Sequence, residues 1–170
     1  MEVGTDREAS IRPVLVLAGT AISLYAADQI TKALVVENVA FGDSFDVIGD
    51  LARLWHVRND GAAFSILPGA TWLFVPVTLV AIGMVVYFHR QFRDRAIWIQ
   101  VILGAILAGS LGNLTDRLRL GYVIDFVSLG FGDTRFPTFN VADSAVVLGI
   151  GALVAYLTFV DQPRSAEPAR

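Results

Sequence analysis

Two aspartates embedded in apolar sequence are the residues best suited to chemistry in this chain. Asp125 lies within the apolar segment 122–127, and Asp143 opens an apolar run after a short loop. Two carboxylates that share a low-dielectric site cannot both ionise easily, so one keeps a proton near neutral pH while the other stays a base. Such a pair can activate water against an amide, because the anion takes the proton of water and the acid stabilises the developing oxyanion. The alternative roles are a helix-start acid for Asp143 and a loop carboxylate for Asp125.

A second group of polar residues follows an apolar stretch in the segment 112–117, GNLTDR. Asn113 is expected about one turn inside the end of a helix, where a buried amide needs a partner. Asp116 and Arg117 also fit ordinary interfacial charges. We favour a functional role for this segment because of Asn113.

Two further segments contain polar residues that fit either a site or a structural role. Asp28 and Lys32 are spaced i and i+4, which places an ion pair on one helix face. An interfacial pair, with Lys32 reaching to the lipid headgroups, is an equal alternative to ligand binding. Asn59, Asp60 and Gly61 taken alone predict a turn and a helix start.

The composition predicts that these residues are positioned by membrane helices. The 170 residues are 55% hydrophobic and 17% charged, whereas soluble domains are about 25% charged. Runs without charge cover residues 13–27, 61–88, 96–115 and 144–160. A helix needs roughly 20 mostly apolar residues to span a bilayer. We therefore predict an all-α membrane protein with four transmembrane helices, at about 12–35, 68–89, 96–116 and 141–161.

The first and fourth helices reach spanning length only by including polar residues. The first includes Asp28 and Lys32, and the fourth begins with residues 140–143. Charge inside a membrane is costly and usually functional. A cleaved signal peptide is an alternative for the first run, because Arg7 and Arg12 precede it. Three further apolar runs make a retained helix the simpler interpretation.

Basic residues predict the orientation of the helices. Three arginines lie between the second and third runs, at positions 90, 93 and 95, which indicates a cytoplasmic loop. Both termini are then cytoplasmic, in agreement with Arg7 and Arg12 at one end and Arg164 and Arg170 at the other. The candidate residues from all segments then meet at the outer face of the bilayer.

The loops define the remaining organisation of one membrane domain, residues 1–170. Outer loops are expected at about 37–66 and 117–140, with short polar tails at both ends. Strands at 45–48 and 51–57 around a turn at 49–50 predict a small extracytoplasmic sheet between the first two helices. Gly130, Gly132 and Pro137 predict that the second outer loop is irregular and mobile.

Several kinds of site are excluded or disfavoured by composition. The chain contains no cysteine, which excludes disulfides, thiol catalysis and cysteine-bound metal. The predicted orientation places His56 and His89 on opposite sides of the membrane, so a histidine zinc site or serine triad is disfavoured. We interpret the arginine cluster as a topology anchor and expect no binding of nucleic acid.

Five motifs in order resemble the lipoprotein signal peptidases, also called signal peptidase II: DQITK from Asp28, NDGAAF from Asn59, GNLTDR from Gly112, VIDF from Val123 and FNVAD from Phe139. The resemblance covers residues from about 14 to 160. It implies that Asp125 and Asp143 form a catalytic dyad. It also implies residues that shape the substrate pocket or support the dyad: Asn59, Gly61, Asn113, Arg117, Asn140, Asp28 and Lys32.

The resemblance further implies an aspartic endopeptidase of the bacterial plasma membrane, with its active site near the outer leaflet. Its substrates are diacylglyceryl-modified prolipoproteins, cut just before the lipidated cysteine. Partners besides the substrate are membrane lipids, and we expect a monomer. No metal or organic cofactor is implied.

Two other functions remain open from the residues alone. A small transporter or proton-coupled channel fits ionisable groups in helices, although here they gather at one membrane face. An assembly factor could bind other helices through the small residues Gly104, Ala108 and Gly112. Replacement of the aspartates by asparagine separates these functions, because only a peptidase loses turnover while binding remains.

Overall fold

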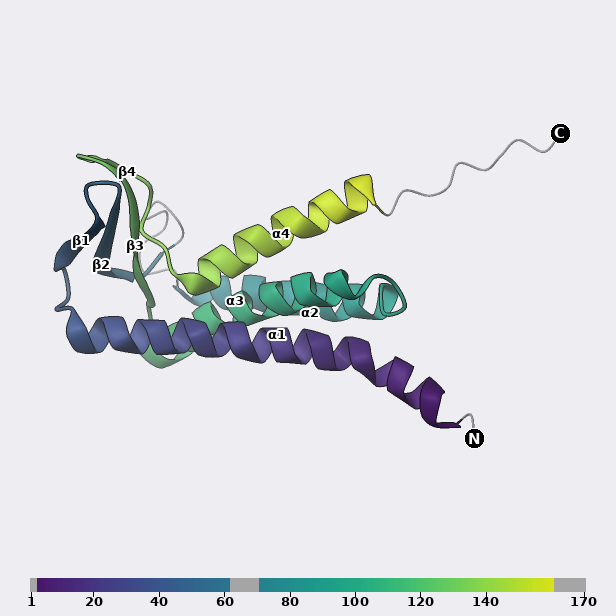
Figure 1. Cartoon of the computed structure of the whole chain (residues 1–170). Coiled ribbons are helices and arrows are strands. Elements are labelled where there is room, and N and C mark those ends of the chain that lie inside the picture. The colour runs from purple at the N-terminus through teal and green to yellow at the C-terminus, as the bar shows by residue number, and fades with distance from the viewer. Residues whose placement is uncertain (1–2, 62–70, 161–170) are drawn as a thin grey trace.

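The computed structural model describes residues 3–61 and 71–160 of the chain. Four helices lie side by side in this part: α1 (Val3–Asn38), α2 (Thr71–Gln91), α3 (Ile97–Leu120) and α4 (Val141–Phe159). A sheet of four strands lies at one end of the bundle: β1 (Ser44–Ile48), β2 (Ala52–Asn59), β3 (Val123–Phe131) and β4 (Thr134–Arg135). The start of α1, the α2–α3 connection and the end of α4 lie at the opposite end (Figure 1).

Each of the four described helices is long and apolar enough to cross a membrane. The spans are Ile11–Asn38, Phe74–Gln91, Ile97–Leu120 and Val141–Phe159. This confirms the prediction of a multi-pass membrane protein with four helices. α3 is the central helix, because 56% of its span is buried within the protein against 17% for α4. The other three helices all pack against α3 and turn apolar side chains outward.

Small residues let the helices approach closely around α3. A Cβ atom on Gly104 would lie 2.7 Å from the backbone oxygen of Leu17 on α1. A Cβ atom on Gly112 would lie 2.5 Å from Asp28 Oδ2, also on α1, and one on Gly109 would meet the backbone of Ala142 on α4. The small-residue face that could have served other helices is therefore occupied by α1 of the same chain.

The sheet extends further than the sequence analysis predicted. Its order is β1-β2-β3-β4, with neighbouring strands antiparallel. The prediction that the second outer loop is irregular is wrong for the residues of β3 and β4, since β3 pairs along β2 with Leu54 opposite Val127. The sheet is thus built from the segment after α3 as well as from the loop between α1 and α2.

Two left-handed glycines account for the path of the chain into and out of β3. Gly121 has φ 82° and closes α3 by donating its N–H to the backbone oxygen of Arg117. Gly132 has φ 54° in the turn from β3 to β4. Side chains other than glycine rarely adopt this backbone region. The first turn sends β3 directly along the end of the helix bundle and so places Asp125 there.

Candidate active site

Asp125 lies in β3, opposite Val57 of β2, and is 2% exposed. Each of its oxygens accepts a hydrogen bond from an asparagine. Asn140 Nδ2 lies 2.7 Å from Oδ1, and Asn59 Nδ2 lies 2.9 Å from Oδ2. Burial, followed by the negative charge of Asp143, raises the pKa of Asp125 from 3.8 to about 7. The hydrogen bonds from Asn59 and Asn140 oppose this shift because they stabilise the anion.

Asp143 is the third residue of α4 and forms a reciprocal cap with Asn140. The Asn140 side chain accepts the N–H of Asp143, and Asp143 Oδ2 accepts the N–H of Asn140 at 3.1 Å. The other carboxylate oxygen, Oδ1, accepts a hydrogen bond of 2.7 Å from Asn113 Nδ2. Asp143 is therefore the helix-start acid considered in the sequence analysis, and it is also held by α3.

One pocket of about 850 Å³ is lined by both aspartates. Its polar wall includes Asn59, Gly61 and Arg117, so two segments distant in sequence meet there with the aspartates. Its apolar wall is formed mostly by the segment after β4 and by the second turn of α4: Phe136, Pro137, Phe139, Val147 and Leu148. The volume suits a ligand of substantial size, with polar groups gathered at one side of an apolar cavity.

Arg117 contributes positive charge to the pocket, which Arg58 and Arg135 also line. It lies one turn after Asn113 on α3, and its guanidinium is 4.9 Å from the ring centre of Phe74 on α2. Its charge interacts with those of Asp143, Asp125 and Asp116. A guanidinium stacked on an aromatic ring keeps its donors at the ring edge, from where they can reach an oxygen in the pocket.

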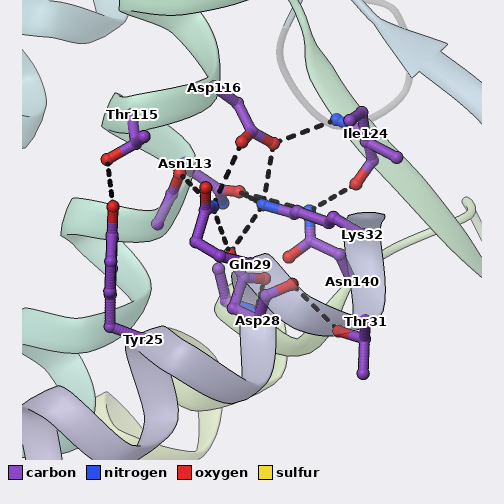
Figure 2. A network of polar contacts seen from close by, with 12 residues as sticks. Tyr25, Asp28, Gln29, Thr31, Lys32, Asn113, Thr115, Asp116, Ile124 and Asn140 are labelled. Carbon is purple, nitrogen blue, oxygen red and sulfur yellow. Dashed lines mark hydrogen bonds and ion pairs between the residues drawn. The ribbon is translucent and has the colours of Figure 1, made fainter. Parts of the chain in front are cut away.

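A buried ionic network lies behind the pocket (Figure 2). Lys32 Nζ is 2.9 Å from Asp28 Oδ2 and 2.8 Å from Asp116 Oδ2. It also donates to Asn113 Oδ1 at 3.1 Å. Lys32 is 2% exposed, so the alternative in which it reaches to the lipid headgroups is wrong.

Gln29 and Tyr25 extend this network along α1 (Figure 2). Gln29 Nε2 lies 3.1 Å from Asp28 Oδ2 and 3.2 Å from Asp116 Oδ1, and Tyr25 is hydrogen-bonded to Thr115. In the described part of the chain, every buried side-chain nitrogen and oxygen has a hydrogen-bond partner. This satisfies the requirement that polar groups inside a membrane be paired.

The structure places the candidate residues at three depths from the pocket. Five of them line the pocket: Asn59, Gly61, Arg117, Asp125 and Asp143. Asn113 and Asn140 lie behind and donate to the aspartates, and Asp28 and Lys32 lie deeper. Residues 62–64 of the motif NDGAAF lie outside the described residues.

Asp116 and Gln29 belong to the deepest group and were missed as site residues by the sequence analysis. Asp116 is 4% exposed and accepts the N–H of Ile124 at 3.2 Å. Its position beside an arginine led to its interpretation as an interfacial charge. No signal in the sequence distinguishes Asp116 from such a charge, because its burial depends on an ion pair with Lys32 of another helix.

Within residues 3–61 and 71–160, no three His, Cys, Asp or Glu side chains are grouped so that they could hold a metal ion. The charged groups on the wall of the pocket are the carboxylates of Asp60, Asp125 and Asp143 and the guanidiniums of Arg58, Arg117 and Arg135. Such groups can bind, polarise and protonate an amide, and they can take a proton from water.

Comparison with known proteins identifies the family. Residues 20–159 match the family Peptidase_A8, described as Signal peptidase (SPase) II. This chain belongs to the signal peptidase II family. Its relatives include a lipoprotein signal peptidase of Symbiobacterium thermophilum, 37% identical over 86% of this chain and 96% of the relative. One from Streptococcus pyogenes serotype M6 is 43% identical over 80% of this chain and 88% of the relative.

Solved structures agree with the family assignment. A bacterial membrane enzyme superimposes with a TM-score of 0.75 and 30% identity, covering 98% of this chain and 97% of the other. A second structure of a bacterial membrane enzyme gives a TM-score of 0.71 and 31% identity. As a member of the signal peptidase II family, the chain is a peptidase, and its four apolar helices place it in a membrane.

Proposed function

We propose that this signal peptidase II removes the signal peptide from diacylglyceryl-modified prolipoproteins by aspartic catalysis. The observation that carries the proposal is the pocket lined by both Asp125 and Asp143. Each aspartate accepts hydrogen bonds from asparagines that fix its orientation. Two oriented carboxylates beside one cavity provide a base for water and an acid for the scissile carbonyl.

The proposed reaction uses one proton shared by the dyad. The ionised aspartate takes a proton from water, and the water oxygen bonds to the carbonyl carbon of the residue before the lipidated cysteine. The protonated aspartate donates to the carbonyl oxygen, which gives a neutral tetrahedral intermediate. When the intermediate collapses, the C–N bond breaks and one hydroxyl gives its proton to the now ionised aspartate as the C=O bond re-forms. The other aspartate gives its proton to the amine of the cysteine, so the dyad again holds one proton. Arg117 can stabilise oxygen charge during these steps.

The walls of the pocket support a substrate that is part peptide and part lipid. Val147 and Leu148 lie about one turn beyond Asp143 on α4, line the pocket and are 69% and 72% exposed. Within a bilayer these side chains contact hydrocarbon. The pocket therefore opens to the acyl region on one side while its polar groups lie at the end of the helices, where a peptide bond next to a lipidated cysteine would be.

The proposed orientation follows from the arginines of the α2–α3 connection. This connection, which contains Arg93 and Arg95, lies at the end of the bundle opposite the sheet, as do the start of α1 and the end of α4 (Figure 1). Arginine-rich short loops stay in the cytoplasm. We therefore place both termini in the cytoplasm and the aspartates near the outer leaflet of the bacterial inner membrane, in an enzyme that acts as a monomer.

The test follows cleavage of a diacylglyceryl-modified precursor by protein purified in detergent. Asp125→Asn and Asp143→Asn are expected to fold and bind the precursor but to lose turnover by at least about three orders of magnitude. Asp133→Asn, at an exposed turn position, is the matched control and should cut normally. Substantial turnover by either dyad variant would contradict aspartic catalysis, and equal cleavage of an unlipidated precursor would contradict the proposed substrate.

A further inference from the structure

The residue that precedes each aspartate of the dyad is held by a buried carboxylate. Ala142, just before Asp143, donates its N–H to Asp28 Oδ1 at 2.9 Å. Ile124, just before Asp125, donates its N–H to Asp116 Oδ2 at 3.2 Å. The same relationship thus occurs twice, and it involves a different helix each time. The position of each dyad residue is set through the peptide unit next to it.

Lys32 joins the two holding carboxylates to each other. Its ammonium is 2.9 Å from Asp28 Oδ2 and 2.8 Å from Asp116 Oδ2. Its third N–H is directed to Asn113 Oδ1 at 3.1 Å. An ammonium has three donors and no acceptor, so all of its hydrogen-bonding capacity is used. Lys32 does not line the pocket, which leaves it no direct contact with a substrate.

These contacts form one continuous chain of bonds between the two aspartates. It runs from the Ala142 N–H through Asp28, Lys32 and Asp116 to the Ile124 N–H. Figure 2 labels the part of this chain from Asp28 to Ile124. Buried charge-assisted contacts of this kind are short and strongly directional. A change in any link alters the separation of α4 from β3, and with it the distance between the two carboxylates.

We propose that Asp28, Lys32 and Asp116 form a positioning unit that fixes the separation of Asp125 and Asp143. The proposal rests on the proposed aspartic function, because separation matters only if the two carboxylates share a proton and a water. None of the three residues is a catalytic residue, since none touches the pocket. Their effect should appear in the rate of the chemical step, and substrate binding should not change.

Asp28→Asn and Asp116→Asn are isosteric and each removes one negative charge. A difference in rate between them therefore reports the positioning of the dyad and not the loss of charge. Asp116 uses one oxygen, Oδ2, for both Lys32 and Ile124, so an asparagine at this position keeps both contacts with its single carbonyl oxygen. Asp28 uses Oδ1 for Ala142 and Oδ2 for Lys32, so an asparagine there loses one of them. Asp28→Asn breaks the chain of bonds, whereas Asp116→Asn leaves it connected.

The experiment measures kcat and KM for a diacylglyceryl-modified precursor, per molecule of folded enzyme, in wild type, Asp28→Asn and Asp116→Asn. Misplacement of catalytic groups by about 1 Å can cost on the order of a hundredfold in rate. We expect Asp28→Asn to lower kcat on that order, with KM within roughly threefold of wild type. The kcat of Asp116→Asn should be at least about tenfold higher than that of Asp28→Asn. Equal losses in the two variants, or losses mainly in KM, would overturn the positioning role.

A second pair of variants, both at Asp116, tests the proposal if Asp28→Asn does not fold. Asp116→Asn and Asp116→Leu both remove the charge, but only asparagine can still accept the N–H of Ile124. The leucine variant should have at least about tenfold lower kcat than the asparagine variant at similar KM, and equal kcat values would overturn the proposal. The proposed function is tested separately by Asp125→Asn, which should be inactive whatever these pairs give.

Discussion

Asn140 Nδ2 lies 2.7 Å from Asp125 Oδ1, and the carbonyl oxygen of the same side chain caps the helix that begins with Val141. One fully buried amide therefore links strand β3 to helix α4. The two polar atoms of this amide make different hydrogen bonds: its oxygen accepts the N–H of Asp143, and its nitrogen donates to Asp125. A substitution can therefore keep the helix cap while it removes the hydrogen bond to Asp125.

Asn140→Ser is expected to retain the cap while losing the donor to Asp125. Serine caps helices about as well as asparagine, whereas alanine in this position costs about 1 kcal/mol. Asn140→Ser should therefore unfold at a higher temperature than Asn140→Ala, while both lose kcat by at least about tenfold. Thermal unfolding in detergent and cleavage assays measure the two effects. Normal turnover in the serine variant would mean that the contact with Asp125 is dispensable.

The pH dependence of cleavage should follow the pKa of Asp125, which burial and then the charge of Asp143 raise to about 7. The dyad needs one proton, and that proton is lost as pH rises through the pKa of its holder. We therefore expect kcat/KM to fall on the alkaline side, with a midpoint near 7. A profile that stays flat from pH 6 to about pH 9 would contradict a proton held at Asp125.

Asn59→Ala should move this alkaline limb to higher pH. The hydrogen bond from Asn59 stabilises the anion and so lowers the pKa of Asp125. Its removal raises that pKa further, and the proton is then retained at higher pH. The measurement compares pH profiles of kcat/KM for Asn59→Ala and wild type. A shift of the limb to lower pH would contradict the hydrogen-bond geometry described for Asp125.

Asp125→Asn should stabilise the protein at neutral and alkaline pH. The pKa of Asp125 in the folded state lies above its ordinary value of 3.8, so the folded state retains a proton that the unfolded state releases. The stability contributed by this proton is complete below about pH 4 and is lost as pH rises to about 7. The unfolding temperature of Asp125→Asn should therefore exceed that of wild type at pH 8 and approach it at pH 4. Asp133→Asn, at an exposed carboxylate, is the control.

Gly104→Ala is expected to destabilise the bundle without a direct effect on the dyad. The added Cβ would lie 2.7 Å from Leu17 O and 2.9 Å from Thr20 Cβ, so α1 must move away from α3. Overpacking of this kind costs about 1–3 kcal/mol. Gly151→Ala is the matched control, because nothing lies within 4 Å of the position of its Cβ. Equal unfolding temperatures for the two variants would contradict the close approach of α1 and α3.

The membrane fold could be predicted because its main determinant is local. Runs of apolar residues specify spanning helices directly, and the start of α4 at residues 140–143 is marked by a capping asparagine and an acid three residues later. The family resemblance also identified Asp125 and Asp143 before their positions were known. Each of these inferences uses short contiguous segments of the sequence.

The parts that could not be predicted depend on contacts between distant segments. β3 is a strand because β2 lies beside it, and nothing within residues 123–131 specifies that partner. Asp116 is buried because Lys32, on another helix, reaches it. In the sequence the same aspartate is indistinguishable from a surface charge at the end of a membrane helix, since only the packing of α1 on α3 decides between them.

The bond between Asp28 and Ala142 joins positions 114 residues apart, from the first helix to the last. During synthesis, a chain whose first three helices have entered the bilayer still lacks the N–H that Asp28 holds and the aspartate that follows it. The proposed dyad is therefore incomplete until the last helix has been inserted, because Asp143 lies on that helix.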